Sequence, residues 1–117
     1  MSDIILYHYS HCSKSRAALA LLAERGINAT IVNYLETPLN AEQLSALLSK
    51  LDLGARALVR TSESAYGDMN LANPSLSEAE LIEAIVQEPI LMQRPILEVG
   101  QRAAIGRPIE NLLELLV

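Results

Sequence analysis

The beginning of the chain alternates strand, helix and strand, and this order restricts the possible folds more than any other feature. Apolar runs at residues 4–7 and 30–32 predict two buried strands. Between them, residues 17–25 carry the apolar face of a helix and end at Gly26, a residue typical of helix C-termini. A strand, a helix and a strand within about thirty residues form the smallest crossover unit for parallel pairing. The sequence therefore predicts an α/β fold.

The middle of the chain predicts helices. Leucines at i, i+3, i+4 and i+7 indicate an amphipathic helix that begins after the cap Asn40 and ends near Gly54. These leucines are Leu44, Leu47, Leu48 and Leu51. Residues 55–60 predict one further helical turn, before a polar loop. Ser77 and Glu80 predict a capping box for a helix that reaches Pro89, with an apolar face formed by Leu81, Ile82, Ile85 and Val86.

The C-terminal part predicts a hairpin and a last helix. Residues 95–99 and 103–105 favour two short strands with a turn at Gly100. Pro108 is expected at the first position of the helix, where the missing N–H costs nothing. Its buried stripe is expected to be Ile109, Leu112, Leu113 and Leu116.

Length and composition exclude several classes of protein. With 117 residues, half of them apolar, we expect a single domain over residues 1–117 rather than a disordered chain. The net charge of −5 and the nine Lys and Arg argue against a nucleic-acid partner. No apolar run approaches the roughly 20 residues that cross a bilayer, and the N-terminus lacks the basic stretch of a secretory signal. We therefore expect no membrane partner and a cytoplasmic location.

The only cysteine, Cys12, lies where the first strand is expected to stop and the first helix to start. Unpaired N–H groups and the helix dipole at such a position favour a thiolate, and they also bind oxyanions. Nearby side chains that can add positive charge are His8, His11, Lys14 and Arg16. We interpret Cys12 as reactive, although a single cysteine is more often an inert core residue. Without a second cysteine, any electrons must come from another molecule.

Seven of the nine cations are arginines, whose planar fork matches a tetrahedral oxyanion. A plainer explanation is available for Arg94 and Arg107. They could cap nearby carbonyls, or pair with Glu98 and Glu110 in surface ion pairs worth at most about 1 kcal/mol.

Five segments carry a more specific signal. They are an H-x-x-x-C-x-x-S-R pattern at residues 8–16, residues 34–38, residues 56–60, residues 89–95 and residues 106–108. In order and spacing they resemble the arsenate reductase family of the glutaredoxin-coupled type, over essentially all 117 residues. The resemblance implies a thioredoxin-like fold, with a central mixed β-sheet flanked by helices and a helical insertion.

The resemblance also implies roles for the matching residues. Cys12 is the nucleophile, and His8 helps to keep its thiol ionised. The residues that hold the oxyanion are Arg60, Arg94 and Arg107. The supporting residues are Ser15, Arg16 and Pro95. Pro95 is expected in a cis peptide bond that directs Arg94 into the site. The resemblance implies no metal and no bound cofactor.

The chain departs from the family pattern beside the cysteine. The usual H-N-P-x-C is here His-Tyr-Ser-His-Cys at residues 8–12, and the common Thr two residues later is Lys14. The proline that stiffens this loop is therefore absent. Lys14 adds a charge that can lower the pKa of Cys12 or narrow the range of anions that fit. His11 is most simply a solvent-facing loop residue.

The activity that the resemblance implies is reduction of arsenate to arsenite. The thiolate attacks arsenic(V) and an oxygen leaves as water, which gives a thiol–arsenate adduct on Cys12. Because no second cysteine exists, glutathione and then a glutaredoxin must supply the resolving thiols.

Two other interpretations stay open. A glutathione-dependent thiol oxidoreductase of the same fold would need Cys12, but it would have no use for three converging arginines. A non-enzymatic regulator that binds RNA polymerase in stress responses typically carries a Cys-x-x-Cys switch, and this chain has Cys-Ser-Lys-Ser at residues 12–15.

Overall fold

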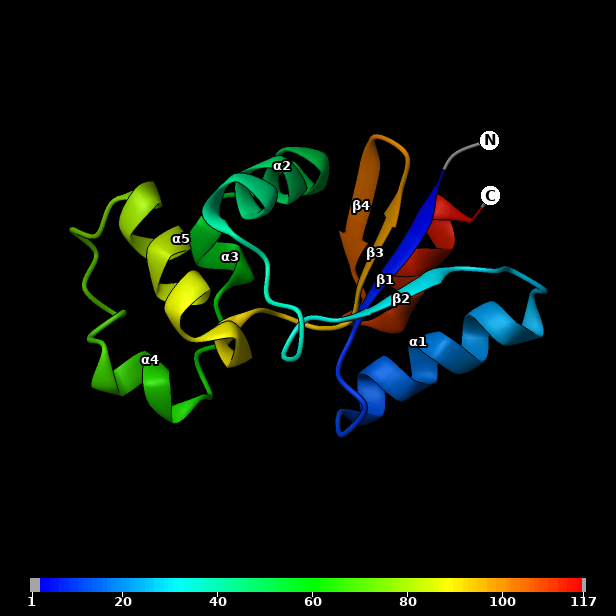
Figure 1. The fold of residues 1–117 in the computed structure, drawn as a ribbon, viewed down its shortest axis with the longest axis horizontal. Coiled ribbons are helices and arrows are strands. Elements are labelled where there is room, and N and C mark those ends of the chain that lie inside the picture. The colour runs from blue at the N-terminus through cyan, green and yellow to red at the C-terminus, as the bar shows by residue number, and fades with distance from the viewer. Residues whose placement is uncertain (1–2, 117) are drawn as a thin grey trace. The chain divides into compact units, whose positions relative to one another are not determined.

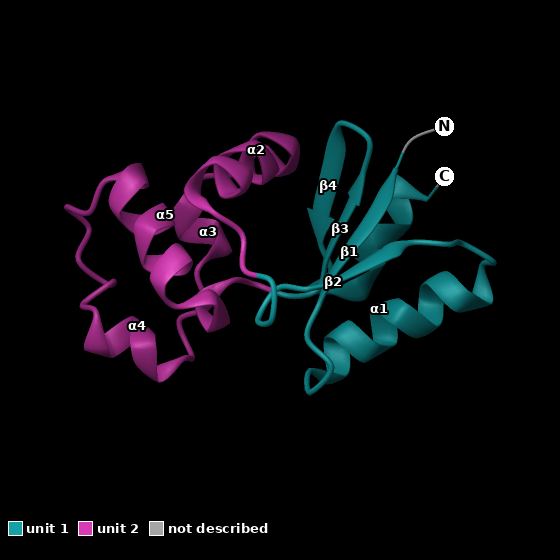
Figure 2. Cartoon of the chain, in the orientation of Figure 1, with its two compact units in different colours: residues 1–37, 94–117 teal, residues 38–93 magenta. Residues whose placement is uncertain are grey.

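The computed structural model describes residues 3–116. They form two compact units (Figure 2), one made of Met1–Thr37 with Arg94–Val117 and the other of Pro38–Gln93. The second unit is therefore an insertion in the sequence of the first. The expectation of one domain over residues 1–117 depends on how the two units are joined, and it stays a prediction.

The first unit contains a mixed four-stranded sheet in the order β2-β1-β3-β4 (Figure 1). The strands are β1 (Ile4–His8), β2 (Thr30–Asn33), β3 (Ile96–Val99) and β4 (Arg102–Ile105). β1 and β2 are parallel, whereas β3 is antiparallel to both β1 and β4. Helix α1 (Ser13–Glu24) connects the parallel pair, and the 3-10 helix η2 (Ile109–Leu115) follows β4. The predicted α/β fold, with its central mixed sheet flanked by helices, is confirmed.

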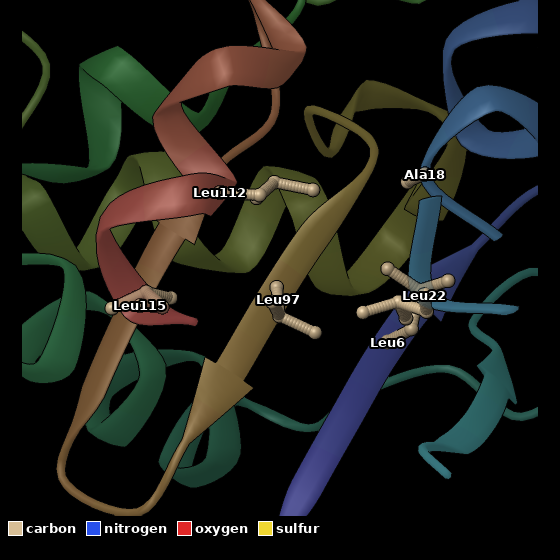
Figure 3. Packing of buried hydrophobic residues seen from close by; sticks show 6 residues of the cluster. All are labelled: Leu6, Ala18, Leu22, Leu97, Leu112 and Leu115. Atoms are coloured by element: carbon tan, nitrogen blue, oxygen red, sulfur yellow. The ribbon is translucent and has the colours of Figure 1, made fainter. Parts of the chain in front are cut away.

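One face of this sheet packs against α1 and η2. Leu6 of β1 and Leu97 of β3 are register partners, and both side chains are completely buried. Figure 3 shows them beside leucines and an alanine from the two helices. The cluster consists of Leu6, Ala18, Leu22, Leu97, Leu112 and Leu115. Burial of these apolar side chains fixes α1, and with it the start of that helix, against the end of β1.

Helix α1 begins at Ser13, directly after its N-cap residue Cys12, so the predicted start of the helix at the cysteine is confirmed. Residues 13–16 are all polar, so the apolar face that the sequence indicated begins only at residue 17. Leu19, expected in the core, is 40% exposed, whereas Ser15 is completely buried. Ser15, Ala18 and Leu22 follow each other at the i, i+3 and i+7 spacing of one helix face. The stop at Gly26 is confirmed, since φ is +66° and its N–H donates to the Ala23 carbonyl.

The second unit is helical, as expected of the insertion. Its helices are α2 (Ala41–Leu51), α3 (Ala55–Leu58), α4 (Ser64–Asp68), α5 (Glu78–Gln87) and the 3-10 helix η1 (Pro89–Leu91). The predicted caps are confirmed. Asn40 and Ser77 each accept from a backbone N–H three residues later, and Gln43 and Glu80 complete the two capping boxes. Within residues 3–116, no helix has the length and apolar character needed to cross a membrane.

The C-terminal helix differs from its prediction. Pro108 has an extended ψ of 162° and lies before η2, so it is not the first helical residue. Its carbonyl accepts from the Asn111 N–H at 3.0 Å and thereby caps the helix. Of the predicted stripe, Leu112 is completely buried as expected, whereas Ile109, Leu113 and Leu116 are half-buried. The second buried position is Leu115, which was not predicted. The helical period explains this difference from the prediction, because a 3-10 helix has three residues per turn and places residues i and i+3 on one line.

Gly106 permits a close contact that no other residue allows. A Cβ at this position would lie 2.9 Å from Pro95 Cγ and 3.2 Å from two Leu112 side-chain atoms. We expect Gly106→Ala to lower the free energy of unfolding by roughly 1–3 kcal/mol, as overpacking does elsewhere. Gly67→Ala is the matched control, because nothing lies within 4 Å of its added Cβ and alanine favours the helix. Urea unfolding of both variants measures the difference, and equal stability would contradict the close contact.

Candidate active site

Cys12 lies in the turn that joins β1 to α1. Its N–H donates to the Tyr9 carbonyl at 3.0 Å, and its own carbonyl accepts from the Arg16 N–H at 3.0 Å. The residue is 8% exposed. The predicted position at the N-terminus of a helix is confirmed.

Arg94 and Pro95 precede β3 in the same unit. Their peptide bond is cis, as predicted, and the Pro95 carbonyl accepts from the Gly106 N–H at 2.8 Å. The Arg107–Pro108 bond is also cis, which the sequence did not indicate. Arg94 is only 7% exposed, and so high a degree of burial is rare for a guanidinium.

Arg107 connects this loop to the cysteine. Its Nη2 donates to Cys12 Sγ at 3.2 Å, and its Nε donates to the Arg94 carbonyl at 2.6 Å. The plainer explanation, in which Arg107 caps a nearby carbonyl, is thus correct for its Nε. The other nitrogen of the same planar fork reaches the sulfur. A guanidinium makes these bonds from two nitrogens in a fixed plane, whereas the three donors of a lysine ammonium all lie on one nitrogen.

These surroundings favour the ionised thiol. Burial of Cys12 raises its pKa, but donors close to the sulfur outweigh this and lower the pKa to about 7. The donors are the Ser15 N–H, the Arg94 side chain, the Ser15 hydroxyl and the Lys14 N–H. A substantial fraction of Cys12 is therefore thiolate at neutral pH.

The lowered pKa makes a direct prediction. The rate of Cys12 alkylation by iodoacetamide follows the thiolate fraction, so it should rise with pH through a midpoint of about 7. It should be nearly constant above that range. Because Cys12 is the only cysteine, the profile needs no correction for other thiols. A midpoint near the ordinary value of about 8.5 would contradict the stabilisation of the thiolate by its neighbours.

His8 does not provide the positive charge that the sequence suggested. Its side chain is buried, and burial lowers the pKa of His8, with a further lowering from the charge of Arg16, although a backbone hydrogen bond at Ser15 opposes the shift. A histidine with a lowered pKa is mostly neutral at pH 7. Any effect of His8 on the thiolate must therefore act through hydrogen bonding or packing rather than through a full charge.

The other predicted residues around the turn divide into buried and exposed groups. The Ser15 hydroxyl, completely buried, accepts from the Tyr9 N–H at 3.4 Å. Arg16 Nη1 donates to the Ser10 carbonyl at 2.8 Å. This bond stabilises the loop and does not involve the Cys12 sulfur. The side chains of Lys14 and His11 are exposed. Lys14 favours the thiolate through its backbone N–H, not through the side-chain charge that the sequence suggested.

Arg60 belongs to the second unit, so it is described apart from the cysteine. It follows α3, is half-buried, and its Nε forms an ion pair with Glu63 Oε2 at 3.1 Å. The structure thus brings together Cys12, Ser15, Arg94 and Arg107 within the first unit. A role for Arg60 stays a prediction.

Two tyrosines of the site were missed. Arg94 Cζ lies 5.0 Å from the centre of the Tyr9 ring. Burial opposes the charge of Arg94, but interactions with the buried Tyr34 and with Cys12 outweigh it and raise the pKa of Arg94. In the sequence, Tyr9 is one residue of a polar loop and Tyr34 follows a strand, so neither position indicates a contact with a distant arginine.

Comparison with known proteins agrees with this geometry. The family model described as ArsC family matches residues 7–115, which include the whole Cys12 turn, Arg94 and Arg107. The chain belongs to the ArsC family. The predicted resemblance is therefore confirmed at the level of the family, over nearly the full length of the chain.

Individual relatives of this ArsC-family chain cover it almost completely. An arsenate reductase of Neisseria meningitidis serogroup A is 44% identical over 113 residues, which are 96% of this chain and 97% of that protein. An arsenate reductase of Haemophilus influenzae is 43% identical over 97% of this chain and 99% of its own length. The solved arsenate reductase of Vibrio cholerae has a TM-score of 0.93 at 39% identity, over 97% of both chains. These similarities confirm the thioredoxin-like fold.

Proposed function

We propose that this protein reduces arsenate to arsenite, with Cys12 as the nucleophile. The observation that carries the proposal is the bond from Arg107 Nη2 to Cys12 Sγ at 3.2 Å, in a site where the pKa of the thiol is lowered to about 7. An ionisable sulfur beside buried guanidiniums suits attack on a tetrahedral anion. Relatives named arsenate reductase, at 43–44% identity, support the choice of arsenate.

The anion is expected to bind with its oxygens on the guanidiniums of Arg94 and Arg107. Both can donate two parallel hydrogen bonds, and both are held by neighbouring groups before the anion arrives. The first N–H groups of α1 add further donors beside the sulfur. Donors that are already in place stabilise the charge that develops as sulfur displaces oxygen.

The reaction proceeds in three balanced steps. First, the Cys12 thiolate forms a bond to arsenic(V), and one oxygen takes up two protons and leaves as water. Second, a glutathione thiolate attacks the Cys12 sulfur. The sulfur–arsenic bond breaks and its electron pair reduces arsenic to arsenic(III), which leaves as arsenite. Third, a glutaredoxin thiolate attacks the glutathione sulfur of the mixed disulfide and frees the Cys12 thiolate.

The lone cysteine supports external thiols as the reductant. Both electrons come from thiols, and this chain supplies only one sulfur, which the first step uses. Glutathione and a glutaredoxin are therefore proposed as co-substrate and partner, with no bound cofactor. Both belong to a reducing compartment, so we also propose a cytoplasmic location.

Arsenite formation with glutathione and glutaredoxin tests the proposal. The purified protein should release one arsenite for each pair of thiols oxidised, and omission of either thiol component should stop turnover. Arg60→Ala and Arg94→Ala should each reduce arsenate turnover by a larger factor than they reduce the rate at which the protein cleaves a glutathione mixed disulfide. If both arginine variants keep full activity and only Cys12→Ser is inactive, a thiol oxidoreductase of the same fold becomes the better account. If arsenite does not form at all, the proposed function is wrong.

A further inference from the structure

The Tyr9 ring lies against the guanidinium of Arg94. The distance from Arg94 Cζ to the ring centre is 5.0 Å, inside the range of about 6 Å over which an aromatic face attracts a cation. Arg94 is 7% exposed, so little water competes for its charge. Cation–aromatic attraction is strongest when both groups are partly desolvated. The contact is therefore placed where it can orient the arginine.

The ring is fixed to the same turn that carries the thiol. The Tyr9 carbonyl accepts from the Cys12 N–H at 3.0 Å, and the Tyr9 N–H donates to the Ser15 hydroxyl at 3.4 Å. The Tyr9 ring also meets the His11 ring edge to face, with centroids 5.4 Å apart and an angle of 63°. Backbone bonds and a second ring thus hold Tyr9 in position relative to Cys12.

We propose that Tyr9 is a positioning residue, which presents the Arg94 guanidinium to the Cys12 sulfur and to the bound oxyanion. An arginine side chain has many rotamers, and ordering it costs free energy at the moment of binding unless it is ordered beforehand. A flat ring against the flat guanidinium limits rotation of the fork. This inference rests on the proposed function for the identity of the anion, but not for the effect on the thiol.

The composition of the loop around Tyr9 gives the inference a second basis. Tyr9 and Ser10 lie between His8 and His11, and no proline stands between His8 and Cys12. The loop therefore lacks a proline ring, which would restrict its backbone conformation. Tyr9 restricts the site in another way, because it connects the loop to Arg94 on the neighbouring segment.

Alkylation of Cys12 tests the proposal without turnover. The variants are Tyr9→Leu, which removes the aromatic face, and Tyr9→Phe, which keeps the face and removes only the hydroxyl. Iodoacetamide alkylation is followed from pH 5 to 10, alone and with increasing arsenate as a protecting anion. Thermal unfolding of both variants shows whether they fold like the parent.

For Tyr9→Leu we expect the arsenate concentration that half-protects Cys12 to rise roughly tenfold, the equivalent of about 1.4 kcal/mol. The midpoint of the alkylation profile should move to higher pH, because Arg94 is no longer aligned with the sulfur. Tyr9→Phe should remain within about twofold of the parent in both measurements, since the ring face is unchanged.

Two results would overturn the proposal. One is a Tyr9→Leu protein whose Cys12 alkylation has the same pH midpoint as that of the parent. The other is a Tyr9→Phe protein that loses as much as Tyr9→Leu, which would assign the effect to the hydroxyl. Failure of arsenate to protect the parent protein would instead count against the proposed function. In that case the midpoint alone decides the role of Tyr9.

Discussion

Replacing Cys12 by Ser is expected to reduce arsenate turnover by at least about a thousandfold, the scale seen when a covalent nucleophile is removed. A serine hydroxyl is almost fully protonated at pH 7, whereas the pKa of Cys12 is lowered to about 7. The adduct with arsenic then cannot form at a useful rate. Steady-state arsenite release, with glutathione and glutaredoxin in excess, measures the loss.

The same substitution should leave the fold intact, which makes its result easy to interpret. Cys12 is the N-cap residue of α1, and serine is among the residues preferred at that position. Circular dichroism and thermal unfolding should therefore match those of the parent, or show a slightly more stable protein. Retention of full turnover by Cys12→Ser would refute the proposed chemistry at its first step.

Loss of Arg107 is expected to have the second largest effect. Arg107→Ala removes the donor at 3.2 Å from the sulfur and the bond to the Arg94 carbonyl together. We expect kcat/KM for arsenate to fall about 10²–10³-fold, as when a donor to developing charge is removed elsewhere. The midpoint of Cys12 alkylation should move upward, because the thiolate loses a hydrogen-bond donor. Arg107→Lys should recover little, since one amine cannot replace the fork.

Arg102→Ala is the matched control for Arg107→Ala. Arg102 lies on β4 in the same unit and is exposed, so its removal changes the net charge by the same amount without touching the site. Its turnover and alkylation profile should equal those of the parent. If both arginine variants lose activity equally, the effect is one of net charge, and the direct bond from Arg107 to Cys12 is not what matters.

The elements that could be predicted from the sequence are those with strong local signals. Asn40 and Ser77 begin their helices as predicted because a side-chain cap and a partner three residues later determine the first turn. The C-terminal helix was predicted with the wrong period, since an apolar repeat of 109, 112, 113 and 116 suits an α-helix. Packing of Leu112 and Leu115 against the sheet selects a three-residue period instead.

The site could be predicted only in part. The position of Cys12 follows from local order, because a strand that ends before a helix places it at the helix N-terminus. The burial of His8 could not be seen locally, and burial is the main cause that lowers the pKa of His8. The contact of Tyr9 with Arg94 joins residues that are 85 positions apart in the sequence. Such contacts depend on tertiary packing, which no single segment determines.

A single-turnover experiment on Cys12 tests the central claim most directly. The protein is mixed with arsenate and glutathione in the absence of glutaredoxin, and intact mass and released arsenite are measured together. The account predicts one glutathionyl group on Cys12 for each arsenite released, and no modification when arsenate is omitted. Arsenite release with Cys12 unmodified, or modification that does not depend on arsenate, would contradict it.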